Sequence, residues 1–417
     1  MKPVILIAPA CFKGSLSSQA VAEEVQHFLL EQLGSEQVAL QLCPIADGGD
    51  DTLFVLESAK TGYQRHRLTV TGPLPNMQVP AEYLFHPDQK SAVIEAAQAH
   101  GLKLMPEKAE LVPLEATSYG VGELIRHVLQ AHQPETLVIT VGGSASTDAG
   151  MGTLQALGFK FLDEAENLLD EPLGGGDLSR IHTVIWPTDM SLFCWKRLII
   201  ATDVVSPLFG PEGAAMVFSP QKGATVQQAL VLDAGLRHIH RLLVSSVSPV
   251  GLASNIGEVL AELPGVGAAG GLAYGLRCLP RSGIISGSQW IGEQLNLAQQ
   301  VSNSQVILTG EGCLDITSLS GKATGYLLSL AGDKPVFIFC GQARDGLSGW
   351  GQVSVYPLVP VFQADSSLAP LTVNHPEQSE QALLQEAMAE PKAALRKALN
   401  AAWPKLQQTL QNLIESG

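Results

Sequence analysis

The chain has 417 residues, of which 46% are hydrophobic and 16% charged, and its formal net charge is −15. This length exceeds what one hydrophobic core supports and predicts roughly two to three domains, while the composition excludes a disordered chain. The acidic balance argues against nucleic acid and against an anionic membrane surface as partners.

The six cysteines are scattered along the chain without paired Cys-x-x-Cys spacing. We therefore expect free thiols in a reducing compartment, and neither a zinc site nor a disulfide framework. Met1-Lys2-Pro3 leads directly into a short apolar run that lacks a signal-cleavage pattern, and no apolar run reaches the ~18 residues of a membrane span. A cytoplasmic protein with no membrane partner is expected.

The first third of the chain alternates strands and helices. Apolar residues 4–8 predict a buried strand, which is followed by a loop with Lys13 and Ser15 and by a helical pattern over residues 17–33. A second strand, residues 38–43, leads into a glycine-bearing loop with Asp47. This rhythm with uninterrupted apolar strands predicts a parallel, doubly wound sheet.

The pattern changes near Tyr63. Three strands are predicted close together, at residues 67–71, 81–85 and 91–95, and they indicate the start of a mixed α+β domain. A helix follows, and Ser118 is placed to cap its N-terminus.

Residues 137–152 predict a buried strand, a tight glycine loop and a helix start. Gly142 and Gly143 open the loop, and Ser144 and Asp148 follow. Such a loop directs backbone N–H groups toward the carboxyl end of its strand, where α/β sheets bind ligands. An ordinary turn in which Asp148 only caps the next helix is the alternative, and both interpretations stay open at this point.

The middle of the chain adds a strand at residues 198–203 that ends in Asp203, and a loop with Lys222 before a long helix over residues 226–243. Gly265-Val-Gly-Ala-Ala-Gly270 matches the dinucleotide fingerprint, but a helix end precedes it and not a buried strand. A tight backbone approach, either helix packing or a ligand wall, is favoured over nicotinamide or flavin binding.

Doubly wound structure returns near the end. A strand at residues 305–309 precedes a predicted loop with Glu311 and Asp315, and Gly321-Lys322 leads a helix. This is no Walker A sequence, because the required earlier glycine is missing and Ala323 occupies the Ser/Thr position. Strands at residues 335–340 and 353–359 complete the pattern.

The simplest organisation is discontinuous. Residues 1–65 and 290–372 are predicted to form a Rossmann-like α/β domain with a doubly wound parallel sheet, and residues 66–289 an inserted mixed α/β domain. Residues 373–417 are predicted to form a C-terminal extension of surface helices without chemistry.

Charged residues recur where strands end. Any one of them is more often a solvated surface charge, but the carboxyl ends of parallel strands converge in space. Carboxylates that bind Mg²⁺, lysines that neutralise charge and loop N–H groups that hold phosphate are what phosphoryl transfer requires. The acidic residues are Asp47, Asp148, Asp203, Glu311 and Asp315, and the lysines are Lys13, Lys222 and Lys322.

Over residues 2–359 these loops form an ordered series that resembles the bacterial two-domain glycerate kinases. The matching motifs are residues 12–16, 44–49, 92–96, 118–125, 142–148, 203–208, 220–224, 267–271, 309–312 and 321–322. The resemblance implies an active site in a cleft between the two domains. It also implies phosphorylation of D-glycerate with ATP and Mg²⁺, with 2-phosphoglycerate favoured over 3-phosphoglycerate as the product.

Site roles follow from the resemblance together with the charge pattern. The expected catalytic residues are Asp148, Asp203, Lys13 and Lys322. Residues expected to bind substrate or phosphate are Ser15, Asp47, Gly142, Gly143, Ser144, Gly270, Gly271 and Glu311. The expected metal ligands are Asp203 and Asp315.

Eight positions depart from the family pattern, namely Ala10, Cys11, Asp50, Asp51, Ala149, Val205, Ser206 and Cys313. The last replaces an arginine, and loss of a guanidinium that pairs with carboxylate or phosphate is not conservative. Reduced activity or a changed substrate therefore stays open. The alternatives are a kinase for another small hydroxy acid and a non-catalytic ligand-binding homologue, with a dehydrogenase a distant third. Whether the protein forms a homodimer is also left open.

Overall fold

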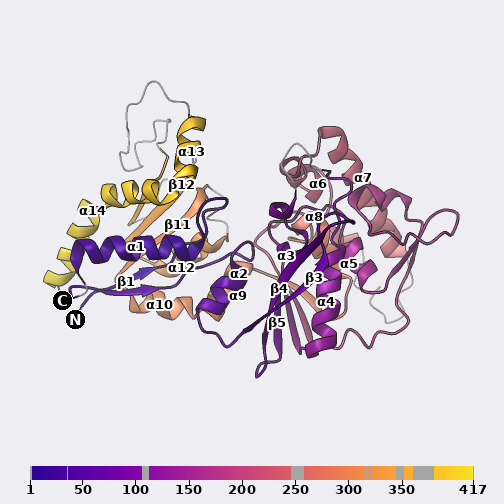
Figure 1. Cartoon of the computed structure of the whole chain (residues 1–417), viewed down its shortest axis with the longest axis horizontal. Coiled ribbons are helices and arrows are strands. Elements are labelled where there is room, and N and C mark those ends of the chain that lie inside the picture. The colour runs from indigo at the N-terminus through magenta and orange to yellow at the C-terminus, as the bar shows by residue number, and fades with distance from the viewer. Residues whose placement is uncertain are drawn as a thin grey trace. The chain divides into compact units, whose positions relative to one another are not determined.

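The computed structural model describes residues 2–34, 36–105, 112–245, 258–315, 318, 321–343, 352–359 and 380–416. The chain folds into two compact units (Figure 1). Unit 1 combines Met1–Thr61 with Gly287–Gly417, and unit 2 is Gly62–Ser286. These borders lie a few residues from those predicted, whereas the predicted border at residues 372 and 373 lies outside the described residues.

Unit 1 contains a sheet whose strand pairs are all parallel. Its strand order is β13-β12-β11-β1-β2, so the winding direction reverses between β1 and β11. Ile5, Leu6 and Ile7 of β1 are fully buried, which requires cover on both faces of the sheet. This confirms the predicted doubly wound sheet. The strands are β1 (Val4–Ile7), β2 (Ala39–Leu42), β11 (Val306–Leu314), β12 (Val336–Ala343) and β13 (Val353–Pro357).

Helices pack on this sheet, and Figure 1 shows α1 and α10 on opposite sides of β1. Ser17 caps α1, because its hydroxyl accepts a hydrogen bond from the Ala20 N–H. The helices of unit 1 are α1 (Ser18–Leu33), α2 (Thr52–Ser58), α9 (Gly287–Gln294), α10 (Leu297–Asn303), α12 (Ala323–Ala331), α13 (Glu380–Ala389) and α14 (Pro391–Ser416).

The C-terminal helix α14 belongs to the core of unit 1, which differs from the predicted surface extension. Leu395, Leu399 and Leu406 are almost fully buried in the same cluster as the residues of β1 and α1. Trp403 meets Phe28 of α1 edge to face, with 6.0 Å between ring centroids. The physical reason is an apolar stripe at helical spacing, which buries against α1 and the strands.

Unit 2 contains a six-stranded sheet in the order β10-β9-β6-β5-β4-β3. Strands β10, β9, β6 and β5 are parallel, and β4 runs antiparallel to both of its neighbours. The predicted mixed α/β architecture is therefore confirmed. The strands are β3 (Gln64–Thr71), β4 (Gln78–His86), β5 (Ser91–Glu95), β6 (Thr136–Thr140), β9 (Arg197–Ala201) and β10 (Ser282–Ile285), and β7 (Lys160–Leu162) and β8 (Thr183–Ile185) form a separate ribbon.

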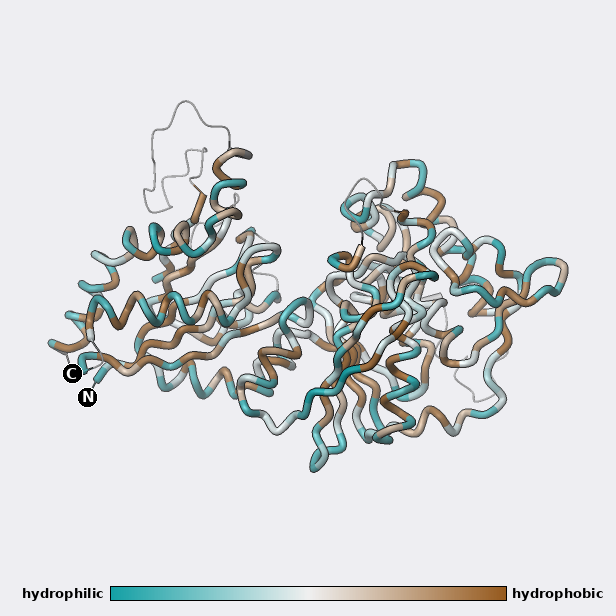
Figure 2. The backbone as a smooth tube through the Cα atoms, viewed as in Figure 1, coloured by the Kyte–Doolittle hydropathy of each residue, from teal (hydrophilic) through white to brown (hydrophobic). Residues whose placement is uncertain are grey.

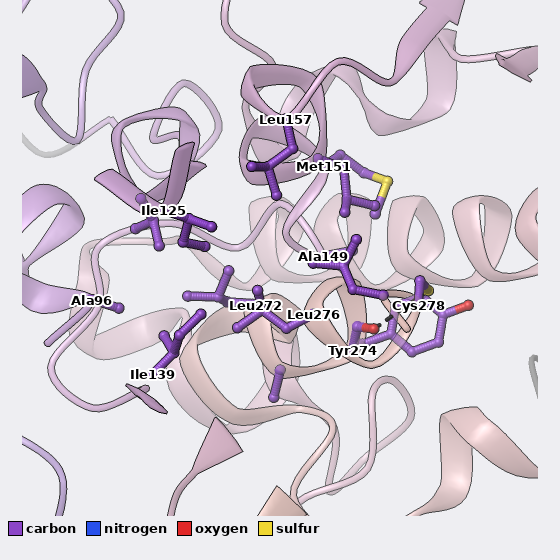
Figure 3. Packing of buried hydrophobic residues seen from close by; sticks show 14 of the residues in the cluster. Ala96, Ile125, Ile139, Ala149, Met151, Leu157, Leu272, Tyr274, Leu276 and Cys278 are labelled. Atoms are coloured by element: carbon purple, nitrogen blue, oxygen red, sulfur yellow. Dashed lines mark hydrogen bonds between the residues drawn. The ribbon is translucent and has the colours of Figure 1, made fainter. Parts of the chain in front are cut away.

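Hydrophobic residues gather along the central strands of each unit (Figure 2). In unit 2, Ala149 from the segment after β6 lies beside Leu272 of α8 (Figure 3), and Met151 and Tyr274 belong to the same cluster of buried residues, so the core fixes that segment to α8. The helices of unit 2 are α3 (Ala97–His100), α4 (Tyr119–His132), α5 (Met151–Ala156), α6 (Ala214–Phe218), α7 (Val226–Ser245) and α8 (Ala268–Arg277), with short 3₁₀ turns that include η4 (Pro220–Lys222).

No helix among the described residues is both long and apolar enough to cross a membrane.

Candidate active site

In unit 1 the loops after β1 and β11 lie at the point where the strand order reverses. Open α/β sheets bind ligands at such a switch point. The Ala10 N–H donates to the Gly310 carbonyl at 2.8 Å, which joins the loop after β1 to strand β11. Lys13 is exposed at the tip of a tight turn, which the Phe12 N–H closes by donating to the Leu16 carbonyl at 2.8 Å. Ser15, in the same turn, donates its hydroxyl to the Phe12 carbonyl at 3.1 Å.

Strand β11 continues through Gly310 and Gly312 to Leu314, so the prediction of a loop beginning at Gly310 was wrong. Glycine is needed here for close packing and not for a turn. A Cβ on Gly310 would lie 2.3 Å from the Phe339 carbonyl oxygen, and one on Gly312 would lie 3.1 Å from the backbone nitrogen of Lys13. The extended strand therefore holds Glu311 on regular sheet backbone, beside Cys340 of β12.

The Glu311 side chain is 9% exposed and only half satisfied by hydrogen bonds. Its Oε2 accepts from the Ser318 hydroxyl at 2.9 Å, while Oε1 has no hydrogen-bond partner among the described residues. The hydroxyl of Thr324 in α12, which is 1% exposed, also has none within the described part of the chain. The Thr324 hydroxyl lies close enough to Glu311 to lower the pKa of the carboxyl, so the two oxygens are neighbours that do not reach hydrogen-bond geometry. Buried polar atoms are nearly always paired in proteins, so this pair of oxygens indicates a place for a ligand, ion or water.

Burial raises the pKa of Glu311, and the nearby Asp47 adds to this, while the Thr324 and Ser318 hydroxyls and the charge of Lys322 oppose it. Asp47 accepts from the Gly49 N–H at 3.0 Å, which shapes the loop after β2. Lys322 is the N-cap residue of α12. Both charges are therefore close enough to act on Glu311.

Two more acidic residues are fixed by the same loops. Asp315 accepts from the Ser318 N–H at 3.1 Å. Asp51 accepts from the N–H of Ser18 at 2.9 Å and thereby ties the loop after β2 to the start of α1. Burial, together with Asp51, Asp50 and Asp47, raises the pKa of Cys11 to about 12, so this thiol stays protonated at neutral pH.

In unit 2, Asp148 is fully buried and accepts five hydrogen bonds. The N–H and hydroxyl of Ser118 donate at 2.8 and 2.7 Å, and the Ser146 hydroxyl donates at 3.1 Å. The N–H groups of Gly150 and Gly152 complete the set at 3.2 and 3.3 Å. Asp148 thus joins its own loop to the first turns of α4 and α5.

This geometry has two consequences. Ser118 occupies the N-cap position of α4 but makes no side-chain cap hydrogen bond, so the predicted cap was wrong; its hydroxyl serves Asp148 instead. Burial raises the pKa of Asp148, and the hydrogen bonds from Ser118, Gly150 and Ser146 oppose this. Because the carboxylate is enclosed and saturated with donors, its geometry suits a residue that positions the loop.

The apex of that loop is exposed to solvent. Gly143 is exposed and has a φ of 67°, a left-handed backbone conformation that favours glycine, and Gly142 is half-buried beside it. Ser144, directly below, is 7% exposed. The Leu102 N–H donates to the Gly143 carbonyl and the Ala145 N–H to the His100 carbonyl, both at 2.8 Å. The segment after β5 therefore braces the loop from one side.

Beneath the loop lies Lys222, which is 3% exposed. Its Nζ donates to the Ser144 hydroxyl at 3.0 Å and to the Ser146 carbonyl at 2.6 Å. Burial lowers the pKa of Lys222 to about 7, and the charge of Asp148 opposes this shift. The sequence identified this lysine as one of three loop lysines but gave it no role.

His100 was missed by the sequence reasoning. It is fully buried, and its Nδ1 lies 3.1 Å from the Ser146 hydroxyl. Burial, with a smaller effect from Lys222, lowers its pKa to about 3, so the ring is neutral at physiological pH. The available signal was its position, shortly after the carboxyl end of the predicted strand at residues 91–95.

The other predicted residues of unit 2 lie next to this loop or follow a neighbouring strand. Asp203 is half-buried after β9 and accepts from the Ser286 hydroxyl at 2.7 Å. Gly270 and Gly271 are buried at the kinked start of α8, with φ values of 67° and 86°. A Cβ on Gly270 would lie 2.1 Å from the Ser146 carbonyl oxygen. Backbone packing thus explains this glycine, and a direct substrate contact stays a prediction.

The predicted residues fall into two groups. Asp203 and Asp315, the predicted metal ligands, belong to different units. Within the described ranges, no three His, Cys, Asp or Glu side chains are grouped so that they could hold a metal ion. Unit 1 carries Lys13, Ser15, Asp47, Glu311, Asp315 and Lys322, and unit 2 carries Gly142, Gly143, Ser144, Asp148, Asp203, Gly270 and Gly271.

Known proteins match the chain over nearly its whole length. The model of the glycerate kinase family matches residues 5–392. The glycerate 2-kinase of Escherichia coli K12 is 34% identical over 372 residues, which cover 88% of this chain and 92% of the relative. An uncharacterized protein of Synechocystis is 36% identical over 414 residues, 99% of either chain. A crystal structure of a candidate glycerate kinase 2 from Salmonella typhimurium LT2 superposes with a TM-score of 0.70 at 31% identity, and the match covers 98% of this chain and all of that one.

Proposed function

The chain belongs to the glycerate kinase family, and from that premise we propose that it transfers the γ-phosphoryl group of ATP to the 2-hydroxyl of D-glycerate with Mg²⁺. The family is named for glycerate kinase, and relatives from Escherichia coli and Halalkalibacterium halodurans carry the names glycerate 2-kinase and glycerate kinase. The name of the Escherichia coli relative, glycerate 2-kinase, supports 2-phosphoglycerate as the product.

One observation carries the assignment of the nucleotide to unit 1. Glu311 Oε1 and Thr324 Oγ1 are buried oxygens without a partner among the described residues, beside the N-terminus of α12 and Lys322. A helix N-terminus and a lysine suit phosphate, since both present positive charge. The two oxygens suit a divalent cation that is shared with the phosphates.

These residues fit Mg²⁺, which prefers oxygen ligands and is usually bound by one or two carboxylates together with substrate phosphates. Glu311 and Thr324 would hold the ion, with Asp315 near Glu311 through their shared partner Ser318. When bound, Mg²⁺ supplies neutralisation of the phosphate charge. Lys13 and Lys322 would contact phosphate oxygens.

The hydroxy acid is assigned to unit 2. Phosphoryl transfer demands positioning and electrostatics more than covalent chemistry, and one carboxylate that accepts the substrate hydroxyl proton is sufficient. We assign this role to Asp203 in preference to Asp148. Asp203 is half-buried with a hydrogen bond from Ser286, whereas Asp148 is enclosed and accepts five hydrogen bonds.

A kinase for another small hydroxy acid is the second candidate, and Cys313 favours it. This residue lies half-buried on β11, in register with Gln342, where the family pattern has an arginine. Without the guanidinium, a phosphate or carboxylate loses a bidentate partner. A changed acid specificity would follow.

The test is ADP release by the purified protein with ATP, Mg²⁺ and D-glycerate. L-glycerate, glycolate, lactate and tartrate serve as the comparison panel. Phosphorus NMR distinguishes 2-phosphoglycerate from 3-phosphoglycerate in the product. We expect D-glycerate to give the highest kcat/KM and the 2-phosphate. Another acid with a higher kcat/KM would establish the second candidate, and no turnover of any acid would refute both.

A further inference from the structure

The donor and the acceptor of each hydrogen bond around Lys222 can be assigned, starting from Asp148. Both oxygens of this carboxylate accept hydrogen bonds from backbone N–H groups, so the side chain accepts and does not donate. The Ser146 hydroxyl therefore donates its only proton to Asp148. The contact between Ser146 Oγ and His100 Nδ1 must then use a proton on Nδ1, which leaves Nε2 as a bare acceptor. His100 Nε2 is buried and has no partner among the described residues.

The same reasoning fixes Ser144. An ammonium group has three donors and no acceptor, so charged Lys222 donates to the Ser144 oxygen at 3.0 Å. The proton of the Ser144 hydroxyl must then be donated elsewhere. Ser144 follows the exposed Gly143 in the chain and is itself 7% exposed. If Lys222 loses its proton, its lone pair becomes the nearest acceptor for Ser144, and the hydroxyl turns inward.

We propose that Lys222 is a positioning residue that turns the Ser144 hydroxyl outward to donate to an anionic oxygen of the substrate. The inference rests on the proposed function and names the element of unit 2 that recognises negative charge. The anionic oxygen belongs either to the carboxylate of the hydroxy acid or to a phosphoryl group. Lys222 acts through Ser144 and through its buried charge, without touching the ligand.

The electrostatic surroundings make this element sensitive to protonation. Lys222 is faced by His100 from α3 and by Asp148 from the loop after β6. His100, with a pKa of about 3, stays neutral near pH 7, and Asp148 favours the charged lysine. With its own pKa at about 7, Lys222 is only partly protonated at neutral pH. An anion bound over Ser144 favours the charged form, so binding takes up a proton.

The test is isothermal titration calorimetry at pH 8 in two buffers of different ionisation enthalpy, which measures the protons taken up on binding. One arm uses D-glycerate alone and the other uses ADP with Mg²⁺. From a pKa of about 7, wild-type protein is expected to take up as much as about 0.9 proton per anion bound. Uptake with D-glycerate assigns the carboxylate, and uptake with the nucleotide assigns the phosphoryl group.

The variants are Lys222→Met and Ser144→Ala, with Lys160→Met as the control for an exposed lysine of the same unit. We expect Lys222→Met to abolish proton uptake and to weaken binding about tenfold to hundredfold, as for loss of a charge-assisted hydrogen bond. Ser144→Ala should weaken binding and reduce the proton uptake, while Ser144→Thr, which keeps the hydroxyl, restores both. Because Ser144→Ala leaves the lysine in place, it serves as the test if Lys222→Met fails to fold.

The outcomes separate this inference from the proposed function. Wild-type turnover combined with unchanged proton uptake in Lys222→Met and Ser144→Ala would overturn the role of Lys222 and leave the kinase assignment intact. The same holds if the wild type binds its ligands without proton uptake. A wild type that neither turns over an acid nor binds either ligand would overturn both.

Discussion

The hydroxyl of Ser118 donates to Asp148 across 2.7 Å and couples the first turn of α4 to the loop after β6. The same hydroxyl accepts from the Thr153 N–H of α5 at 3.1 Å. Ser118 and Asp148 thus form the junction of two helices and one loop, and both side chains are fully buried. The loop that carries Gly142, Gly143 and Ser144 is therefore held by a rigid base, which is what preorganised recognition of an anion requires.

Asp148→Asn tests this junction. In the wild type, the surrounding N–H groups donate to the Asp148 carboxylate. The side-chain NH₂ of the asparagine is a donor and would face these N–H groups, so buried donors lose their acceptor. We expect the free energy of unfolding to fall by about 2–4 kcal/mol. Ser118→Ala, which removes only the hydroxyl, should cost about 1–2 kcal/mol. Urea unfolding followed by circular dichroism measures both. Full stability with lost activity in Asp148→Asn would instead make Asp148 a catalytic residue.

Asp203→Asn has the opposite signature. As the proposed acceptor of the substrate hydroxyl proton, Asp203 should affect the rate and not the fold. We expect kcat to fall by about 10²–10⁴-fold, as for loss of a general base. The free energy of unfolding should change by less than about 1 kcal/mol, because the side chain is half-buried. Steady-state kinetics beside urea unfolding measures the split, and a kcat within threefold of wild type would exclude Asp203 as the base.

Glu311→Gln should stabilise the protein and weaken nucleotide binding. Burial raises the pKa of Glu311, so the folded state binds its proton more tightly than the unfolded chain does. The carboxyl therefore destabilises the fold progressively as pH rises above its unfolded value. A neutral amide removes this penalty, and we expect a gain of about 1 kcal/mol at pH 8.

The matching binding measurement is electron paramagnetic resonance of Mn²⁺ with ADP, which reports the cation without turnover. Loss of one carboxylate ligand should weaken Mn²⁺ binding about tenfold or more. Glu293→Gln, at an exposed glutamate of α9, is the matched control. Unchanged Mn²⁺ affinity in Glu311→Gln would remove Glu311 from the cation site.

Much of this architecture was readable from the sequence, for particular physical reasons. Strands such as β1 and β6 are unbroken apolar runs. Asp203 directly follows such a run, so its place at the carboxyl end of a strand could be predicted. The burial of Lys222 could not, because it depends on a loop more than 70 residues away, with Ser144 and Ser146. Gly310 was taken for a turn because a glycine required by a neighbouring strand looks the same in sequence.

Acidification should destabilise unit 2 through His100. Its pKa is about 3 in the folded state and 6.5 in its ordinary state, so the folded state binds the proton less tightly. The stabilising contribution is complete above pH 6.5 and is lost as pH falls below that value. Between pH 7.5 and pH 5 we expect a loss of about 2 kcal/mol from this residue.

Urea unfolding at both pH values measures the difference, and the change of slope is compared between variants. His100→Asn should flatten the pH dependence, although His132, whose pKa is also lowered by burial, retains part of it. His27→Gln, at an exposed position of α1, is the control and should follow wild type. An unchanged pH dependence in His100→Asn would show that the buried ring accepts a proton at little cost.

Leu399→Ala tests whether α14 is part of the core of unit 1. The side chain is 1% exposed and packs in the cluster that contains Phe28 and Phe337, so its loss leaves a cavity. We expect the free energy of unfolding to fall by about 2–4 kcal/mol. Ile414→Ala removes an aliphatic side chain of the same helix that is 54% exposed, and should change it by less than about 0.5 kcal/mol. Equally small changes in the free energy of unfolding for both variants would mean that the helix lies on the surface and is not part of the core. A large effect of Leu399→Ala alone would mean that the last helix is required to cover the sheet that holds Glu311.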